Sequence, residues 1–516
     1  MGSFLRRSSF AIVLALVAPP SPAESPRIGE RPVIERHLDQ QKIEAGLVSL
    51  AEILKHGQQL FDARFNKLDG AGRPATTGHG LPRGTSQPLF TRLSGPDANS
   101  CFACHSLPRS GGAGEFTANV FVLAQERDPV IRTLDEKDSN ERNSLGMFGS
   151  GPIEMLAREM SADLIKIREA AREEARRSGQ PVRLRLETKG VSFGSILVHP
   201  DGLIDPRGIE GLDWDLIVKP FHQKGALVSL REFTVTAMNH HHGMQASERF
   251  GDGVDADRDG VADELTAGDI TAVSFYQAAL ATPGQLLPRD PARRAAVERG
   301  EALFAQVRCT SCHIPSLVLD KPVFSEPNPY NPPGNLRLPE GARPVSFDLT
   351  REGFGARLER LPDGRARVRA FTDLKRHDIS DGDYPHFANE RLAQGTLPGS
   401  APASDFTEPP QPRPVRQFLT RKLWDAGNSD PYGHRGDLTT LTEAIHFHGG
   451  EARASRDAYF ALPEDDRAAV IEFLKSLQVL PDDAGLVAEE PPGDEATVNV
   501  GVSSRQASGS HPPTRP

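Results

Sequence analysis

The stretch Arg308-Cys309-Thr310-Ser311-Cys312-His313 contains two thiols three positions apart, followed at once by an imidazole. Two such thiols add to the vinyl groups of one haem, and the adjacent histidine then binds the iron from one face. A second copy, Cys101-Phe102-Ala103-Cys104-His105, lies far earlier in the chain. The sequence therefore predicts two covalently bound haem c groups, with His105 and His313 as iron ligands.

An isolated Cys-x-x-Cys is also typical of thioredoxin-like redox pairs and of zinc sites. Here all four cysteines of the chain lie in the two motifs, and each motif carries its histidine at the same offset. Neither a zinc site nor a redox pair requires this repeated histidine, so the pattern favours haem. Because no cysteine is left over, we expect no structural disulfide.

With 516 residues and two distant motifs, the chain is too long for one cytochrome fold. We predict a mainly α fold, with two c-type-cytochrome-like helical domains, long loops and small β-hairpin insertions. A glycine and an aromatic residue precede each motif and let that helix cross closely against a C-terminal helix. The expected segments are an arm at 24–40, a first haem domain at 41–284, a second at 285–480 and a disordered tail at 481–516.

Periodicity adds several local predictions. Apolar residues at helical spacing indicate helices over residues 156–177, 266–280 and 464–477. Alternating apolar and polar residues over 182–186 and 191–198 indicate a small hairpin.

The N-terminus is typical of a secretory signal peptide. Two arginines at 6 and 7 precede an apolar run at 10–18, and small residues follow up to Ala23. The run is shorter than the ~20 residues that span a bilayer, which leaves a membrane anchor as the weaker interpretation. We expect cleavage of residues 1–23 after about Ala23, a periplasmic location and no membrane span in the mature chain.

The net charge of the chain limits the kinds of partner that it can bind. The net charge is −10, and the sequence has no basic patch typical of nucleic-acid binding. An acidic surface suits a small redox protein of opposite charge, of the cytochrome c or cupredoxin type, as electron donor or acceptor.

The sixth iron ligands are the next question, because they separate electron transfer from chemistry. No methionine follows the second motif, so its ligand must be a histidine, and His448 stands before two glycines that allow close approach. The other histidines of this domain are His377, His386, His434 and His446, of which His434 and His446 better suit a surface position or a contact with a haem propionate. For the first haem the candidates are His199, His222, the run His240–His242, Met147 and Met155, and an open position is equally allowed.

Two further residues are candidates for catalysis. Glu154 is placed to act as an acid–base group for peroxide cleavage at an open first haem, although an exposed acid at a helix N-terminus is equally consistent with the sequence. Trp214 is a candidate electron relay between the haems, and the alternative is an ordinary core residue.

Residues 251–264 show the Asp-x-Asp-x-Asp-Gly spacing of a calcium loop. Its candidate ligands are Asp255, Asp257, Asp259, Val261 and Asp263. Thr266 stands where the loop usually ends in an acid, so a merely polar turn is the open alternative.

Both haem motifs, residues 142–154, residues 373–378 and above all residues 440–452 (Thr-Leu-Thr-Glu-Ala-Ile-His-Phe-His-Gly-Gly-Glu-Ala) resemble the di-haem oxidoreductase, putative peroxidase family, which is also labelled thiol oxidoreductase-like. The family is related to bacterial di-haem cytochrome c peroxidases. In those peroxidases the position of His448 holds a methionine that ligates the electron-transfer haem, so the resemblance implies the same role for His448 at a lower potential. Their capping histidine after the first motif has no counterpart between His105 and His199, which favours an open first haem or a ligand from elsewhere.

The resemblance implies a periplasmic di-haem c-type oxidoreductase that reduces peroxide, or another small oxidant, at the first haem with electrons from the second. A non-enzymatic electron-transfer cytochrome and a di-haem oxygenase that acts on an organic substrate are the two alternatives.

Overall fold

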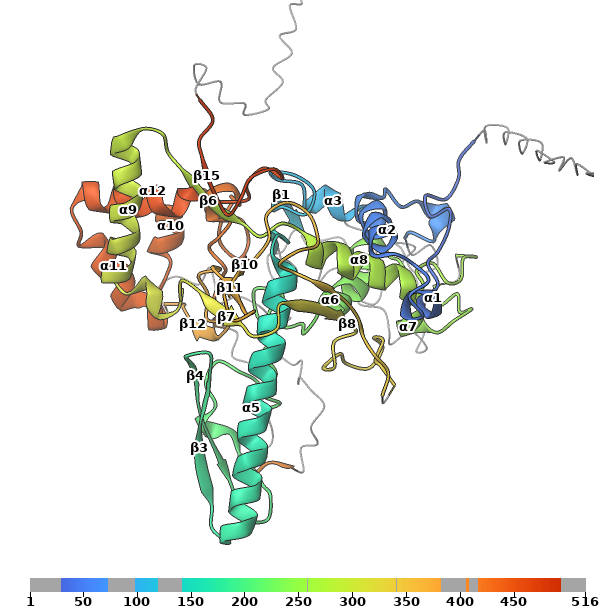
Figure 1. Ribbon diagram of the computed structural model, residues 1–516, viewed down its shortest axis with the longest axis horizontal. Coiled ribbons are helices and arrows are strands. Elements are labelled where there is room, and N and C mark those ends of the chain that lie inside the picture. Colours follow the sequence, from blue (N-terminus) through green and yellow to red (C-terminus); the bar gives the residue numbers. More distant parts are fainter. Residues whose placement is uncertain are drawn as a thin grey trace, which may run out of the picture.

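The computed structural model describes residues 29–72, 98–118, 142–257, 259–339, 341–381, 405–407 and 416–492. The predicted signal peptide lies outside the described residues, as do residues 493–516 of the predicted tail. Figure 1 shows a body of helices and short strands, from which the long helix α5 (Ser150–Ser178) projects together with strands β3 and β4. None of the helices in the described ranges combines the length and apolarity that crossing a membrane would need.

A pair of crossing helices supports the first motif. Helix α2 (Leu50–Asp62) begins at a Ser49 capping box, and α8 (Ala267–Ala279) begins at the same device built on Thr266. A Cβ added at Gly57 would lie 2.0 Å from the Ala272 carbonyl oxygen of α8. The close helix crossing predicted from this glycine is therefore confirmed.

The second motif has an equivalent pair, α9 (Pro291–Gln306) and α12 (Glu464–Ser476). A Cβ at Gly300 would lie 2.0 Å from the Ala469 carbonyl oxygen. The rings of Phe304 and Phe473 pack beside this contact, with centroids 5.6 Å apart. The same arrangement thus occurs twice in the chain.

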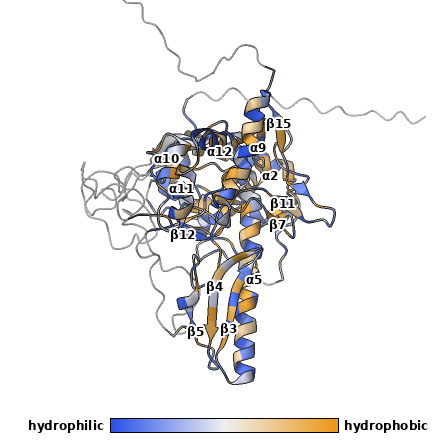
Figure 2. Cartoon of the chain, turned by 90° about the vertical axis from the view of Figure 1, so that its left-hand side faces the viewer, coloured by the Kyte–Doolittle hydropathy of each residue, from blue (hydrophilic) through white to orange (hydrophobic). Residues whose placement is uncertain are grey.

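The projecting unit consists of α5 and a three-stranded antiparallel sheet. Its strands are β3 (Val182–Thr188), β4 (Val191–Val198) and β5 (Ile204–Asp205). Figure 2 shows hydrophobic residues on β3 and β4 and a mixture of hydrophobic and hydrophilic residues along α5. Leu186, Phe193 and Ile196 are fully buried there. The predicted helix and hairpin are confirmed.

The prediction of a mainly α fold is wrong. Of the residues that the structure describes, 37% are helical and 16% lie in strands, and these strands form six small sheets. Several strands have two to four residues and pair with partners remote in sequence: β6 (Gly284–Leu287) pairs with β14 (Leu477–Gln478) and, in parallel, with β15 (Val487–Glu489). Such short runs carry no alternation that a local pattern could reveal. Strand β15 also shows that residues 481–492, predicted as part of a disordered tail, are ordered.

The other named elements are shorter, and most of them shape the walls around the two motifs. They are α1 (Gln40–Glu44), α3 (Cys101–Cys104), β1 (Gly114–Ala118), β2 (Arg142–Ser144), α6 (Leu230–Ala237), η4 (Met238–His242), α7 (Ser247–Phe250), η5 (Cys309–Ser311), β7 (Leu317–Leu319), β8 (Val323–Glu326), β9 (Val345–Asp348), β10 (Glu359–Arg360), β11 (Ala366–Val368), β12 (Arg376–Asp378), β13 (Gln417–Leu419), α10 (Leu441–His446), η9 (Gly450–Ala452) and α11 (Arg453–Phe460).

Two main groups of buried apolar side chains form the core. The larger runs from Leu38 to Val479 and includes α5, α8 and the strands β7, β8 and β9. The smaller surrounds α9 and α12, with Phe473 fully buried at its centre. The boundary between haem domains near residue 284 remains a prediction.

Candidate functional site

A single cavity of about 720 Å³ is lined by both Cys-x-x-Cys-His motifs. Its volume lies in the range of small-molecule and cofactor sites. The four cysteines form no disulfide. Burial raises the pKa of Cys101 and of Cys309 to about 12, with the neighbouring cysteine of each motif adding to the effect. A redox-active thiol pair needs the opposite shift, so the thiols do not resemble a thioredoxin-like centre.

His313 and His448 face each other across the part of this cavity that lies beside the second motif. Their ring centroids are 6.4 Å apart. The His313 Nδ1–H donates to the Phe371 carbonyl at 3.0 Å, and the His448 Nδ1–H donates to the Ala444 carbonyl at 2.6 Å. Both Nε2 lone pairs are therefore left for a metal.

This spacing fits a haem iron. Two imidazoles that each lie about 2 Å from one iron have ring centroids roughly 6 Å apart. Burial, together with the neighbouring His448, lowers the pKa of His313 to about 4. Burial also lowers the pKa of His448. Both imidazoles are neutral at pH 7, which is the form that binds iron.

His105 of the first motif is held in the same way as His313 of the second motif. The His105 Nδ1–H donates to the Gly112 carbonyl at 3.3 Å, and burial lowers the pKa of His105 to about 4. The ring of Phe61 lies 6.3 Å from His105, as Phe304 lies 6.2 Å from His313. The helix that leads into each motif therefore places an aromatic ring against the histidine in the same way.

The distal side of the first motif differs from that of the second. In the described part of the chain, no imidazole ring is in contact with His105 as His448 is with His313. The imidazole of His241 is nevertheless near enough to contribute to the lowered pKa of His105. The run His240–His242 lies on the π-helical turn η4 and lines the cavity, as do His222 and Met147. The His242 Nδ1–H donates to the Ala98 carbonyl at 2.7 Å, and its Nε2 is 3.5 Å from the Cys101 sulfur. His199 and Met155 do not line the cavity.

Glu154 and Trp214 do not line the cavity either. Glu154 is fully buried and accepts hydrogen bonds from the Leu230 backbone N–H and the Asn328 side chain, both at 2.8 Å. It therefore holds the first turn of α6, the helix that leads into η4. Trp214 packs edge-on against Phe406 at 4.8 Å in the projecting unit.

A different tryptophan, Trp424, is buried beside the cavity, although its own side chain does not line it. It is 1% exposed, and a Cβ at Gly149 would lie 2.2 Å from its ring. Its neighbours Leu423 and Ala426 line the cavity near the second motif, while Met147 and Ser150, beside Gly149, line it near the first. No local sequence signal distinguishes the two tryptophans.

The buried position of Glu154 yields a prediction on stability. Burial and the neighbouring Glu326 raise the pKa of Glu154 from 4.5 to about 8. The folded state thus holds a proton that the unfolded chain releases, so wild-type stability falls as pH rises from about 4.5 to about 8. Glu154→Gln should remove this pH dependence, so its free energy of unfolding should fall less than that of the wild type between pH 5 and pH 9.

Urea unfolding at pH 5 and at pH 9 measures the effect. The exposed Glu298→Gln is the matched control and should behave as wild type at both values. A Glu154→Gln variant that loses as much stability as the wild type between pH 5 and pH 9 would contradict the prediction.

Three of the five residues predicted as calcium ligands in the loop at residues 251–264 lie close together. Carboxylate oxygens of Asp255, Asp257 and Asp259 lie within 4.8 Å of one another. Asp257 is fully buried, and its Oδ2 has no hydrogen-bond partner. Asp263 is outside this group, because its Oδ1 accepts the Gly253 N–H at 2.7 Å, and nothing in the group involves Val261. Glu264, which the sequence spacing did not single out, is buried nearby and accepts the Gln245 backbone N–H at 2.7 Å.

Residues 413–477 match the family model described as di-haem oxidoreductase, putative peroxidase. No curated protein matches the chain. Among solved structures, hydrazine synthase from Kuenenia stuttgartiensis is 13% identical, with 89% of this chain and 98% of that chain covered and a TM-score of 0.35. A MauG-like protein associated with microbial copper homeostasis is 18% identical, with 49% and 67% covered and a TM-score of 0.24.

The matched segment contains α10, His448, α11 and α12, which together form one wall of the second haem site. Residues 413–477 of this chain are thus similar to the di-haem oxidoreductase, putative peroxidase family, which confirms the resemblance noted for residues 440–452.

Proposed function

We propose that this chain is an exported di-haem enzyme that reduces peroxide at its first haem and receives electrons through its second. Cys101 and Cys104 would hold the first haem, and Cys309 and Cys312 the second, each through two thioether bonds. The proposal rests above all on the unequal histidines: His313 faces His448 at 6.4 Å, whereas His105 faces no imidazole at that spacing. A saturated iron suits electron transfer, and an open one suits chemistry.

Bound haem supplies the redox chemistry, in which two electrons and two protons convert hydrogen peroxide into two molecules of water. The chain supplies the surroundings. Gly112 orients His105 through its carbonyl, and the imidazoles of the run His240–His242 lie on the cavity wall, where proton exchange with a peroxide oxygen is required.

Trp424 is our choice for the electron route, in place of Trp214. Its buried ring stands between segments that line the two parts of the cavity. Trp424→Phe should slow the re-reduction of the first haem after peroxide is added, and Trp214→Phe should leave that rate unchanged. Stopped-flow spectroscopy on the two variants tests this assignment.

Electron paramagnetic resonance of the oxidised protein tests the proposed function itself. We expect one high-spin and one low-spin signal, and peroxide turnover when a small reduced cytochrome c or cupredoxin is supplied as the donor. Two low-spin signals in both the oxidised and the half-reduced protein would overturn the proposal and favour an electron carrier. Intact mass after removal of free haem reports covalent attachment, and cleavage after Ala23 reports export to the periplasm.

We further propose that Asp255, Asp257 and Asp259 bind calcium. Three hard oxygen donors converge, and Asp257 offers a buried oxygen without a hydrogen bond. Burial, together with Asp259 and Asp255, raises the pKa of Asp257 to about 7, so the folded protein gains from a cation at this point.

Calcium at 100 times its dissociation constant should stabilise the wild type by about 2.7 kcal/mol. Asp257→Asn should lose this stabilisation and be at least as stable as wild type without calcium, since it removes buried repulsion. Asp252→Asn, in the same loop but exposed, is the matched control. Thermal unfolding with calcium and with a chelator decides the question, and an unchanged calcium response in Asp257→Asn would reject the site.

A further inference from the structure

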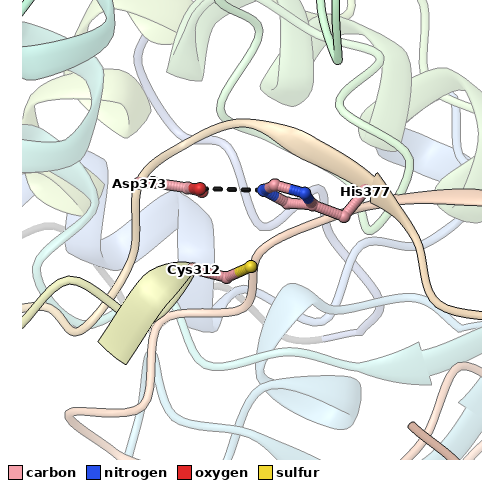
Figure 3. A group of neighbouring side chains, drawn as sticks. All are labelled: Cys312, Asp373 and His377. Carbon is pink, nitrogen blue, oxygen red and sulfur yellow. Dashed lines mark hydrogen bonds and ion pairs between the residues drawn. The ribbon is translucent and has the colours of Figure 1, made fainter. Parts of the chain in front are cut away.

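Two motifs that haem attachment does not explain meet beside the second haem site. One is residues 373–378, which run into strand β12, and the other is the Gly449-Gly450-Glu451 sequence after His448. His377 belongs to residues 373–378, and it lines the cavity together with Glu451. Figure 3 shows the His377 ring between Asp373 and the strand, with Cys312 below it.

Both ring nitrogens of His377 are paired with carboxylates. Its Nε2 is 2.8 Å from Asp373 Oδ2, and its Nδ1 is 2.8 Å from Glu451 Oε2. Because a carboxylate only accepts at neutral pH, both nitrogens carry hydrogen, and the ring is an imidazolium. Burial lowers the pKa of His377, but the hydrogen bonds and charges of Asp373 and Cys312 together outweigh burial and raise the pKa.

The same residues anchor the backbone that follows His448. Glu451 accepts the Asp378 N–H through its second oxygen at 2.9 Å. The Gly449 N–H donates to the Ile379 carbonyl at 2.8 Å, and the Gly450 N–H donates to Asp381 at 2.8 Å. The histidine that faces His313 is thus followed directly by three residues bound to the β12 segment.

The imidazolium also lies next to the second haem attachment point. Ligand atoms of Cys312, Asp373 and His377 lie within 4.8 Å of one another. These three residues have the donor types of a metal site, but an imidazolium bonded at both nitrogens has no lone pair for a metal. What remains is a buried positive charge beside the sulfur that would carry the haem.

We propose that His377 is a positioning residue for the second haem, whose charge, held between Asp373 and Glu451, raises the reduction potential of that haem and whose bond to Glu451 keeps His448 in place. This inference rests on the proposed attachment at Cys312 and on ligation by His448. A fixed cation favours the reduced iron, which carries one positive charge less.

Spectroelectrochemical titration of the second haem in the complete di-haem protein is the test. His377→Gln removes the positive charge and should shift the midpoint potential of the second haem to more negative values. Glu451→Gln removes a negative charge at the same place and should shift it to more positive values. The second shift should be smaller, because the Glu451 side chain is 52% exposed and the His377 side chain only 10%.

Opposite signs separate the charge from loosened packing, since a loosened His448 would move both variants in the same direction. His446→Gln, on α10 and outside the cavity lining, is the matched control and should leave the potential unchanged. If His377→Gln does not fold, the positive shift of Glu451→Gln still tests the proposal. Equal potentials in wild type and in the folded variants, or shifts of one sign, would overturn it.

The readout is independent of peroxide chemistry. If the first haem fails to react with peroxide, the potential of the second haem still reports on His377. If the protein binds no haem covalently, intact mass reveals this before the titration, and the proposed function is what fails.

Discussion

Replacing His448 by alanine is expected to abolish the low-spin signal of the second haem, while the thioether bonds to Cys309 and Cys312 persist. The reason is geometric: His448 is the imidazole that faces His313, with ring centroids 6.4 Å apart. Without it the iron loses one strong ligand and becomes high-spin. Electron paramagnetic resonance and optical spectra of the oxidised variant measure the change.

The space left by the missing imidazole in His448→Ala allows a second test of the same ligand. Free imidazole added to His448→Ala should occupy the position of the lost side chain and restore the low-spin signal. His448→Met should stay low-spin with a higher potential, in keeping with the methionine of the related peroxidases. His446→Ala is the matched control and should keep the wild-type spectrum. An unchanged low-spin signal in His448→Ala would show that another residue ligates the iron.

Replacing Gly300 by alanine is expected to destabilise the protein strongly. The new Cβ would stand 2.0 Å from the Ala469 carbonyl oxygen and 2.8 Å from the Phe473 Cβ, so α9 and α12 must move apart. Overpacking of this kind costs roughly 1–3 kcal/mol, occasionally more. Because the obstacle is a backbone oxygen that cannot move aside, we expect a destabilisation near the upper end of this range. The free energy of unfolding in urea is the quantity to measure.

Gly485→Ala is the matched control, because its nearest heavy atom would be 3.9 Å away. Gly57→Ala adds a comparison in the other helix pair, where the Ala272 oxygen is equally close at 2.0 Å. We expect Gly300→Ala to disturb the spectrum of the second haem and Gly57→Ala that of the first. Equal unfolding midpoints for Gly300→Ala and Gly485→Ala would refute the prediction.

Features that depend on nearby residues were predictable from the sequence. The attachment motifs are such features, because two thiols and a histidine must be adjacent to hold one haem. Helix α8 begins after Thr266 and α12 at Glu464, as the periodicity predicted, since caps and apolar faces are set within a few residues. The glycines at 57 and 300 were recognised as contact points for the same reason.

Features that depend on contacts between residues remote in sequence could not be predicted from the sequence. Glu154 appeared to be a catalytic acid, but the Leu230 N–H and Asn328 bind it in the interior. Trp424 packs against Gly149, a residue remote in sequence, and the short strands that make the fold mixed pair across many residues. Glu264 rather than Asp263 lies buried beside the acidic loop. In each case the deciding contact joins segments whose distance in space no local pattern encodes.

The sequence by itself thus predicted where haem would attach, which histidines would bind the iron from the proximal side and, through the lack of later methionines, that a histidine would complete the second site. Only the tertiary structure decided that His448 lies opposite His313, that no imidazole ring in the described part of the chain contacts His105 in this way, and that His377 is enclosed by two carboxylates. The physical reason is that thioether attachment needs neighbours in the chain, whereas axial pairing and buried charge depend on distances that arise only when remote segments pack together.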